Sequence, residues 1–128
     1  MIDNMLVIQN IRVIVCNQKF FLELWLRQSD PSTPIRIIVS SLSYSTEDTD
    51  KWITSHYQGN IDFIERILDK GEAHNYYCFA AELDEKAYRS ILTYATRVSF
   101  KITNYDNPND TKSYICTLNN GHLEEMNK

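Results

Sequence analysis

The segment from Leu6 to Arg27 places the strongest constraint on how this chain can fold. It begins with a stretch rich in Val and Ile from Leu6 to Cys16, passes through the polar pair Asn17-Gln18, and ends in an extended stretch from Phe20 to Arg27. Apolar side chains recur at every second residue of that last stretch, the period that places them on one face of a strand. These residues are Phe20, Leu22, Leu24 and Leu26. The pattern predicts a β-hairpin with one face in the core.

Four later segments carry strand signals, because they are rich in β-branched and aromatic residues and are bounded by turn residues. They are Ile35–Ser40, Tyr76–Leu83, Val98–Thr103 and Tyr114–Leu118. The Pro-containing loop before Ile35 separates the first of them from the hairpin, since proline cannot continue a ladder. We therefore expect an antiparallel sheet of about five to six strands.

Two segments favour helices. Apolar residues at spacings of three and four predict a long helix from about Glu47 to Lys70, preceded by a capping pattern at Ser45 and Asp48. Those residues are Ile53, Tyr57, Ile61, Ile64 and Leu68. A second helix should begin after Asp84, a good N-cap, and carry Tyr88, Ile91, Leu92 and Ala95 on one face.

Length and composition favour one globular domain. The 128 residues are 43% hydrophobic and 23% charged, which is ordinary for a folded protein and near the commonest domain size. The fold class predicted is α+β: a single domain over residues 1–128, with about two or three helices packed on one face of the sheet. Residues 119–128 are expected to form a flexible tail.

Charge and cysteine usage limit the possible partners and location. There are 13 basic and 17 acidic residues without a basic stripe, so we expect no binding to duplex nucleic acid. Polar residues interrupt the apolar run from Met5 to Cys16, and no basic segment precedes it, so neither export nor a membrane span is expected. Three widely spaced cysteines favour reduced thiols. We therefore expect a cytoplasmic protein.

No motif for a metal, a cofactor or catalysis is present. The histidines His56, His74 and His122 are isolated from one another and from the cysteines, whereas a zinc site needs about four ligands at short spacings. The three glycines form no phosphate-binding loop. We expect neither a metal nor a cofactor. His56, next to Tyr57, or His74, near Tyr76 and Tyr77, could still act as a general base in an enzyme that lacks known motifs.

Other groups with possible chemistry have simpler interpretations. Cys78 lies between aromatic residues in a predicted strand, where packing is expected rather than nucleophilic attack. The acids Asp62, Glu65 and Asp69 could supply a hydrolase pair, but Asp62 lies four residues before Arg66, the spacing of an ordinary solvated ion pair on a helix. Oxygen ligands for a cation occur between Asp106 and Asp110, yet the glycine and glutamate of a calcium loop are missing.

The second face of the hairpin is the most informative feature for function. Arg12 should neighbour Glu23, Trp25 and Arg27 across the two strands, and Arg36 would extend this patch if the third strand joins them. Arg and Trp contribute disproportionately to binding at protein interfaces. The patch could be a contact surface, or a helix of the same chain could cover it with the arginines at its rim.

Three functions remain open. The leading hypothesis is a non-enzymatic interaction module, such as an inhibitor, an immunity-type protein or a regulatory protein, that binds another protein through Arg12, Trp25, Arg27 and Arg36. Homodimerisation through the same face is a variant of it. The alternative is binding of an anionic, nucleotide-like small molecule by arginines and stacking aromatic residues. The third is the enzyme based on His56 or His74.

Overall fold

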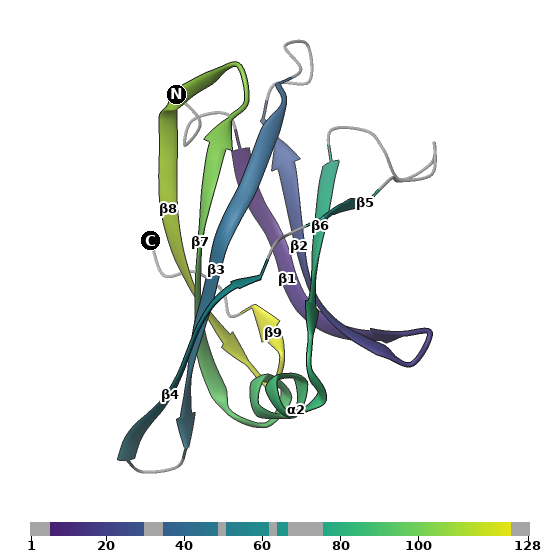
Figure 1. Cartoon of the computed structure of the whole chain (residues 1–128), viewed down its shortest axis with the longest axis vertical. Helices are drawn as coiled ribbons and strands as arrows, with labels where there is room; N and C mark the ends of the chain where they lie inside the picture. The colour runs from purple at the N-terminus through teal and green to yellow at the C-terminus, as the bar shows by residue number, and fades with distance from the viewer. Residues whose placement is uncertain (1–5, 30–34, 49–50, 62–63, 67–75, 124–128) are drawn as a thin grey trace.

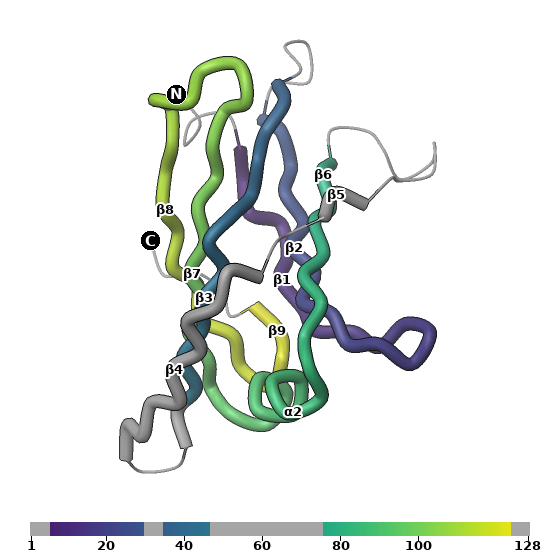
Figure 2. The backbone as a smooth tube through the Cα atoms, in the orientation of Figure 1, coloured from purple at the N-terminus to yellow at the C-terminus, as the bar shows by residue number. Residues whose placement is uncertain are grey.

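The fold is seen in a computed structural model of the whole chain (Figures 1 and 2). The structure describes residues 6–29, 35–48, 51–61, 64–66 and 76–123. Side chains are described over 6–29, 35–46 and 76–123.

Within these described segments the chain forms nine strands in a single antiparallel sheet. The sheet curves strongly into a nearly closed barrel, which Figure 1 shows as two walls facing each other. The strand order is β4-β3-β7-β8-β9-β1-β2-β6-β5. The strands are β1 (Leu6–Cys16), β2 (Lys19–Gln28), β3 (Ile37–Asp48), β4 (Lys51–Ile61), β5 (Ile64–Arg66), β6 (Tyr76–Leu83), β7 (Ala95–Asn104), β8 (Asn107–Asn119) and β9 (His122–Leu123).

The predicted α+β class is therefore wrong. Only one short helix, α2 (Glu85–Thr93), lies in the described part of the chain, and the sheet forms a barrel-like wall rather than a layer covered by helices. The helix predicted from Glu47 to Lys70 is replaced by the end of β3, by β4 and by β5. Leu68 lies outside the described residues.

Strand pairing explains why the prediction of a helix failed. Ser45, predicted as a helix cap, lies inside β3 and pairs with His56 of β4 on one side and with Arg97 of β7 on the other. β-Branched and aromatic residues are frequent in β4, and they favour an extended chain once a neighbouring strand is available. An apolar spacing of three and four can arise in a short strand segment by chance, so tertiary pairing decided the outcome.

The first hairpin is confirmed. β1 and β2 pair antiparallel from Leu6↔Gln28 to Cys16↔Lys19, with Asn17 and Gln18 at positive φ in the turn. Positive φ at both turn residues matches the right-handed twist of the flanking strands. The apolar face lies in the core, where Leu22, Leu24 and Leu26 are almost completely buried.

The helix after Asp84 is also confirmed. The Asp84 carboxylate accepts a hydrogen bond from the backbone N–H of Ala87 at 2.7 Å, which satisfies one donor of the first turn. Ala87 and Ile91 are buried, and the helix packs across the lower end of the barrel against β1, β2, β6 and β8 (Figure 1). No helix in the described segments is both long enough and apolar enough to span a bilayer.

β6 has the predicted bounds, while β7 and β8 extend beyond them. β9 lies within the segment predicted as a tail, and it bridges β8 and β1. The Gly121 carbonyl accepts a hydrogen bond from the backbone N–H of Val13 at 3.3 Å. β9 thus joins the two halves of the barrel. Residues 124–128 lie outside the described part.

Candidate functional site

A buried carboxylate organises the face of the first hairpin that points away from the core. Leu22 and Leu24 face the interior, so strand alternation places Glu23, between them, on the opposite face. Only 1% of the surface of Glu23 is nevertheless exposed to solvent. Removing a carboxylate from water costs on the order of several kcal/mol. Hydrogen bonds and an opposite charge must therefore compensate for the lost hydration.

Arg12 and Trp25 supply such groups. Arg12 lies directly opposite Glu23 in the ladder, and its Nε and Nη2 each lie 2.9 Å from Oε1 of Glu23. The indole Nε1 of Trp25 donates to the same oxygen at 2.5 Å. The carboxylate therefore fixes a guanidinium and an indole in one orientation. Fixing them before binding lowers the entropy lost when they contact a partner.

These side chains border an open hollow of about 380 Å³. It is lined by Gln9, Asn10, Arg12 and Trp25. The β1–β2 register shifts between Ile8 and Asn10, so an extra residue in β1 places two amide side chains beside the indole. The lining thus combines a flat aromatic surface, a cation and amide groups that can donate and accept hydrogen bonds.

Arg27 lies next to this hollow on the same face. It is two residues beyond Trp25 in β2, and it is partly exposed. Its Nε donates to Oε1 of Gln9 at 3.4 Å, a long contact with a neutral acceptor. The structure therefore brings together three of the four residues predicted to bind a partner.

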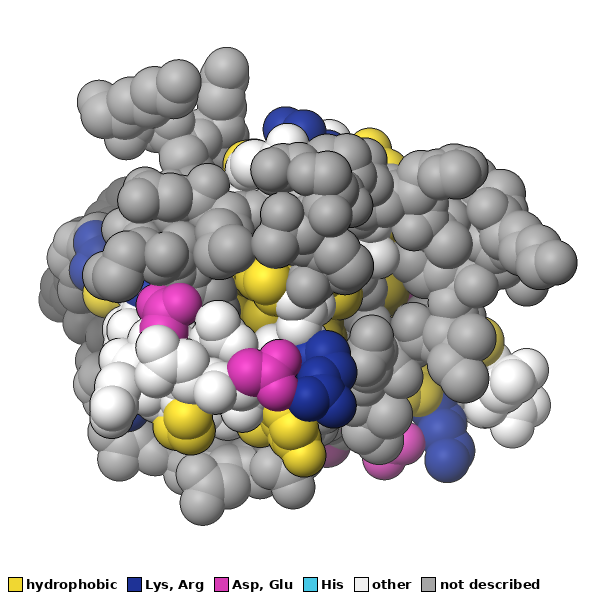
Figure 3. Space-filling view, turned by 90° about the horizontal axis from the view of Figure 1, so that it is seen from above, with side chains coloured by type: hydrophobic (Ala, Val, Ile, Leu, Met, Phe, Trp, Pro, Cys, Tyr) yellow, Lys and Arg dark blue, Asp and Glu magenta, His cyan; other side chains and the backbone are white. Residues whose placement is uncertain are grey.

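Arg36 lies elsewhere. β3 is separated from β1 by β7, β8 and β9, so the third strand does not join the first hairpin. The Arg36 Nη2 lies 2.6 Å from Oδ1 of Asp106, and the guanidinium lies 4.4 Å from the centre of the Tyr105 ring. The hydrogen bond and charge of Asp106 raise the pKa of Arg36. Figure 3 shows this upper end of the molecule, where an acidic and a basic side chain touch among polar and hydrophobic neighbours.

The described residues give little support to the catalytic and metal-binding alternatives. His122 is exposed in β9, while the side chain of His56 and the whole of His74 lie outside the described part. No group of three or more His, Cys, Asp or Glu in the described segments could hold a metal ion. The oxygens predicted as possible cation ligands lie in the β7–β8 hairpin, where Asp106 pairs with Arg36.

The two buried thiols also lack the setting of a nucleophile. Cys78 is fully buried in β6, and Cys116 is 2% exposed. Burial raises the pKa of Cys116 to about 11, because the charged thiolate would lose its hydration. Cys16, at the end of β1, is exposed. Packing therefore accounts for the two buried thiols.

We predict that only Cys16 reacts quickly with an aromatic disulfide reagent at about pH 8, because the reaction requires an accessible thiolate. Counting released chromophore should give one fast thiol in the native protein and three in denaturant. Cys16→Ser should abolish the fast phase. Rapid reaction of Cys116 in the native state would contradict its burial.

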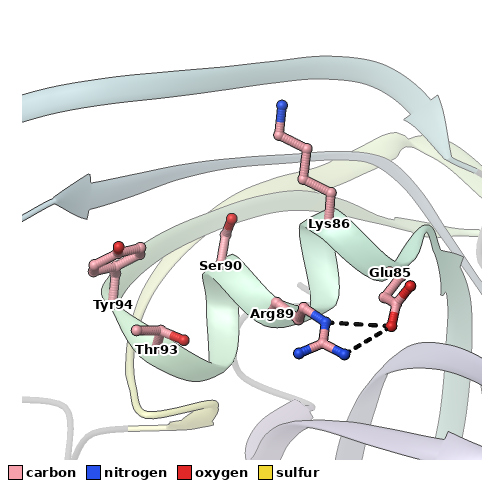
Figure 4. A pocket seen from close by; sticks show the side chains of 6 residues that line it. All are labelled: Glu85, Lys86, Arg89, Ser90, Thr93 and Tyr94. Carbon is pink, nitrogen blue, oxygen red and sulfur yellow. Dashed lines mark hydrogen bonds and ion pairs between the residues drawn. The ribbon is translucent and has the colours of Figure 1, made fainter.

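A second hollow, of about 430 Å³, lies on the outer side of α2 (Figure 4). Its described lining residues follow two rows with a spacing of four, and sequence analysis missed them. They are Glu85, Arg89 and Thr93, and Lys86, Ser90 and Tyr94. Nη2 of Arg89 lies 2.9 Å from Oε1 of Glu85. The other polar groups of the described lining are one lysine and three hydroxyls. This open lining suits weak polar contacts.

Comparison with known proteins adds no functional information. No family model, curated protein or solved structure matches the chain.

Proposed function

We propose that this protein is a non-enzymatic interaction module, of the inhibitor, immunity or regulatory kind, that acts in the cytoplasm. It binds another protein through Arg12, Trp25 and Arg27 on the outer face of β1 and β2. One observation carries this function: Glu23, only 1% exposed, holds Arg12 and Trp25 in fixed positions on a partly exposed face.

The chemistry of these residues suits a protein interface. Trp and Arg are the residue types most often found to dominate binding energy, because they bury large areas and make planar, charge-assisted contacts. The Arg12 side chain is 41% exposed although it is bonded to Glu23, so part of this side chain remains accessible to a partner. Gln9 and Asn10 surround the indole with groups that can satisfy backbone or side-chain hydrogen bonds.

A small-molecule binder is the second candidate. The hollow of about 380 Å³ is within the size range of ligand sites, and an indole beside a guanidinium could hold a base and a phosphate. However, the hollow is open and is lined by only four described residues, which favours contact with the flatter surface of a protein over enclosure of a small molecule. A nucleotide that raises the melting temperature of the wild type but not of Trp25→Ala would favour this second function.

The protein-binding function is tested by affinity capture from extracts of the source cells. Wild-type protein should retain a partner that Trp25→Ala retains at least about tenfold less, because a central Trp commonly contributes about 2 kcal/mol or more. Ile115→Ser is the matched control: Ile115 is 70% exposed on β8, away from the proposed surface. Its capture should equal that of the wild type.

The identity of the retained species separates the remaining possibilities. If native mass measurement shows a second copy of this chain that Trp25→Ala removes, the face is a homodimer interface. If every retained protein binds Trp25→Ala and wild type equally, the proposed surface is wrong.

A further inference from the structure

The proposed surface carries a positive charge although the chain as a whole is acidic. The chain has a formal net charge of −4. On the outer face of β1 and β2, the described charged residues opposite one another are Arg12 and Glu23, and their charges cancel. By strand alternation Lys19 lies on the same face at the turn end of β2, and its Nζ is 3.6 Å from Oε1 of Glu82 on β6, so that charge is also paired. Arg27 is the remaining described charge on this face, and it forms no ion pair with any described side chain.

Apolar and aromatic residues surround Arg27 in the ladder. Val7 of β1 and Tyr76 of β6 lie directly opposite it on its two sides, and they are 39% and 36% exposed. Trp25 precedes it by two residues on the same face. Directly opposed residues on one sheet face have side chains close enough to form one contact surface. Arg27 is thus a cation between partly exposed apolar and aromatic side chains.

An ion pair that apolar side chains shield from solvent is stronger than one formed in water. When a partner covers Val7, Trp25 and Tyr76, it excludes solvent and lowers the local dielectric constant around Arg27. A guanidinium covered without a counter-charge would instead oppose binding, since its hydration would be lost without compensation. The partner therefore needs an anion at this point.

We infer that the partner protein presents an Asp or Glu side chain, flanked by apolar residues, to Arg27. This inference rests on the proposed function and adds the chemistry of the partner to it. A planar carboxylate matches the fork of guanidinium donors, and the apolar neighbours match Val7 and Tyr76.

A pair of labelled octapeptides tests the inference directly. One alternates Leu with Glu, and the other alternates Leu with Gln. Fluorescence polarisation up to about 1 mM peptide should show the Glu peptide binding the wild type about fivefold more tightly than the Gln peptide. The preference should fall to within about twofold in Arg27→Gln, and it should weaken between about 50 and 500 mM salt. Lys101→Gln removes a charge of the same sign from an exposed position on β7 and should keep the preference.

Equal binding of the two peptides, binding of neither, or a preference that survives Arg27→Gln would each overturn the inference. None of these results would affect Trp25-dependent capture of a partner, so the proposed function could still stand. Loss of Trp25 dependence in the capture experiment would remove both.

Discussion

Glu23→Ala is expected to lower the free energy of unfolding by about 2–3 kcal/mol. The substitution removes the acceptor shared by Arg12 and Trp25, and hydrogen bonds to a charged group contribute about 1.5–3 kcal/mol. Breaking a buried ion pair can cost about 3–5 kcal/mol, but the Arg12 side chain is 41% exposed and can regain water. Urea denaturation of the wild type and the variant measures the difference.

Glu82→Ala is the matched control for this substitution. Glu82 lies on the adjacent strand β6, and its Oε1 is 3.6 Å from Nζ of Lys19. Both side chains of that pair are more than half exposed, so its removal should change the unfolding free energy by less than about 0.5 kcal/mol. If Glu23→Ala is no more destabilising than Glu82→Ala, the carboxylate does not organise the site.

Gly121→Ala is expected to destabilise the fold by about 2–4 kcal/mol. A Cβ atom at Gly121 would lie 2.8 Å from Cγ2 of Val13 and 3.1 Å from Cδ1 of Leu92, and the backbone φ of +79° adds strain for any side chain. Overpacking in a dense interior commonly costs about 1–3 kcal/mol. The steric clash lies where β9 meets β1 and α2, so the junction between the barrel halves should loosen.

Asn120→Ala is a useful comparison for Gly121→Ala. Asn120 also has a positive φ, of 52°, but it is exposed, so only backbone strain of about 1 kcal/mol is expected. Comparing the melting temperatures of the two variants separates the effect of backbone strain from that of the steric clash with Val13 and Leu92. Equal loss of stability in both would mean that contact with Val13 and Leu92 is unimportant.

Local sequence signals predicted the elements whose partners are close in the chain. The β1–β2 hairpin needed only alternation from Phe20 to Leu26 and a two-residue turn, and α2 needed a cap at Asp84 with an apolar face. β9 follows a similar local signal, Asn120-Gly121, a turn-forming pair that favours positive φ within the segment predicted as a tail.

Elements that depend on distant pairing were not predictable in the same way. β3 and β4 are adjacent in the chain, but this pair joins the sheet only through the pairing of β3 with β7, some fifty residues away in the chain. The same limitation applies to Arg36. Alternation places Arg36 on the opposite side of the chain from Ile37 and Val39, but no local signal shows that β3 lies beyond β7 and β8.

At the candidate site, sequence analysis predicted that Arg12 lies beside Glu23 and that Trp25 shares their face. It did not predict that Glu23 is buried, because alternation assigns that face to solvent. It also missed Gln9 and Asn10, since the register shift near Ile8 changes which β1 residues flank the indole.

The most direct measurement is the ¹H–¹⁵N resonance of the Trp25 indole N–H, assigned with Trp25→Phe, in the absence and presence of the captured partner. In the isolated protein its hydrogen exchange should be slow, and it should become fast in Glu23→Ala, because Glu23 accepts this hydrogen bond. On addition of the partner, the indole resonance should shift strongly. Fast exchange in the wild type, or an unchanged resonance in the complex, would show that Glu23 and Trp25 do not form a binding surface.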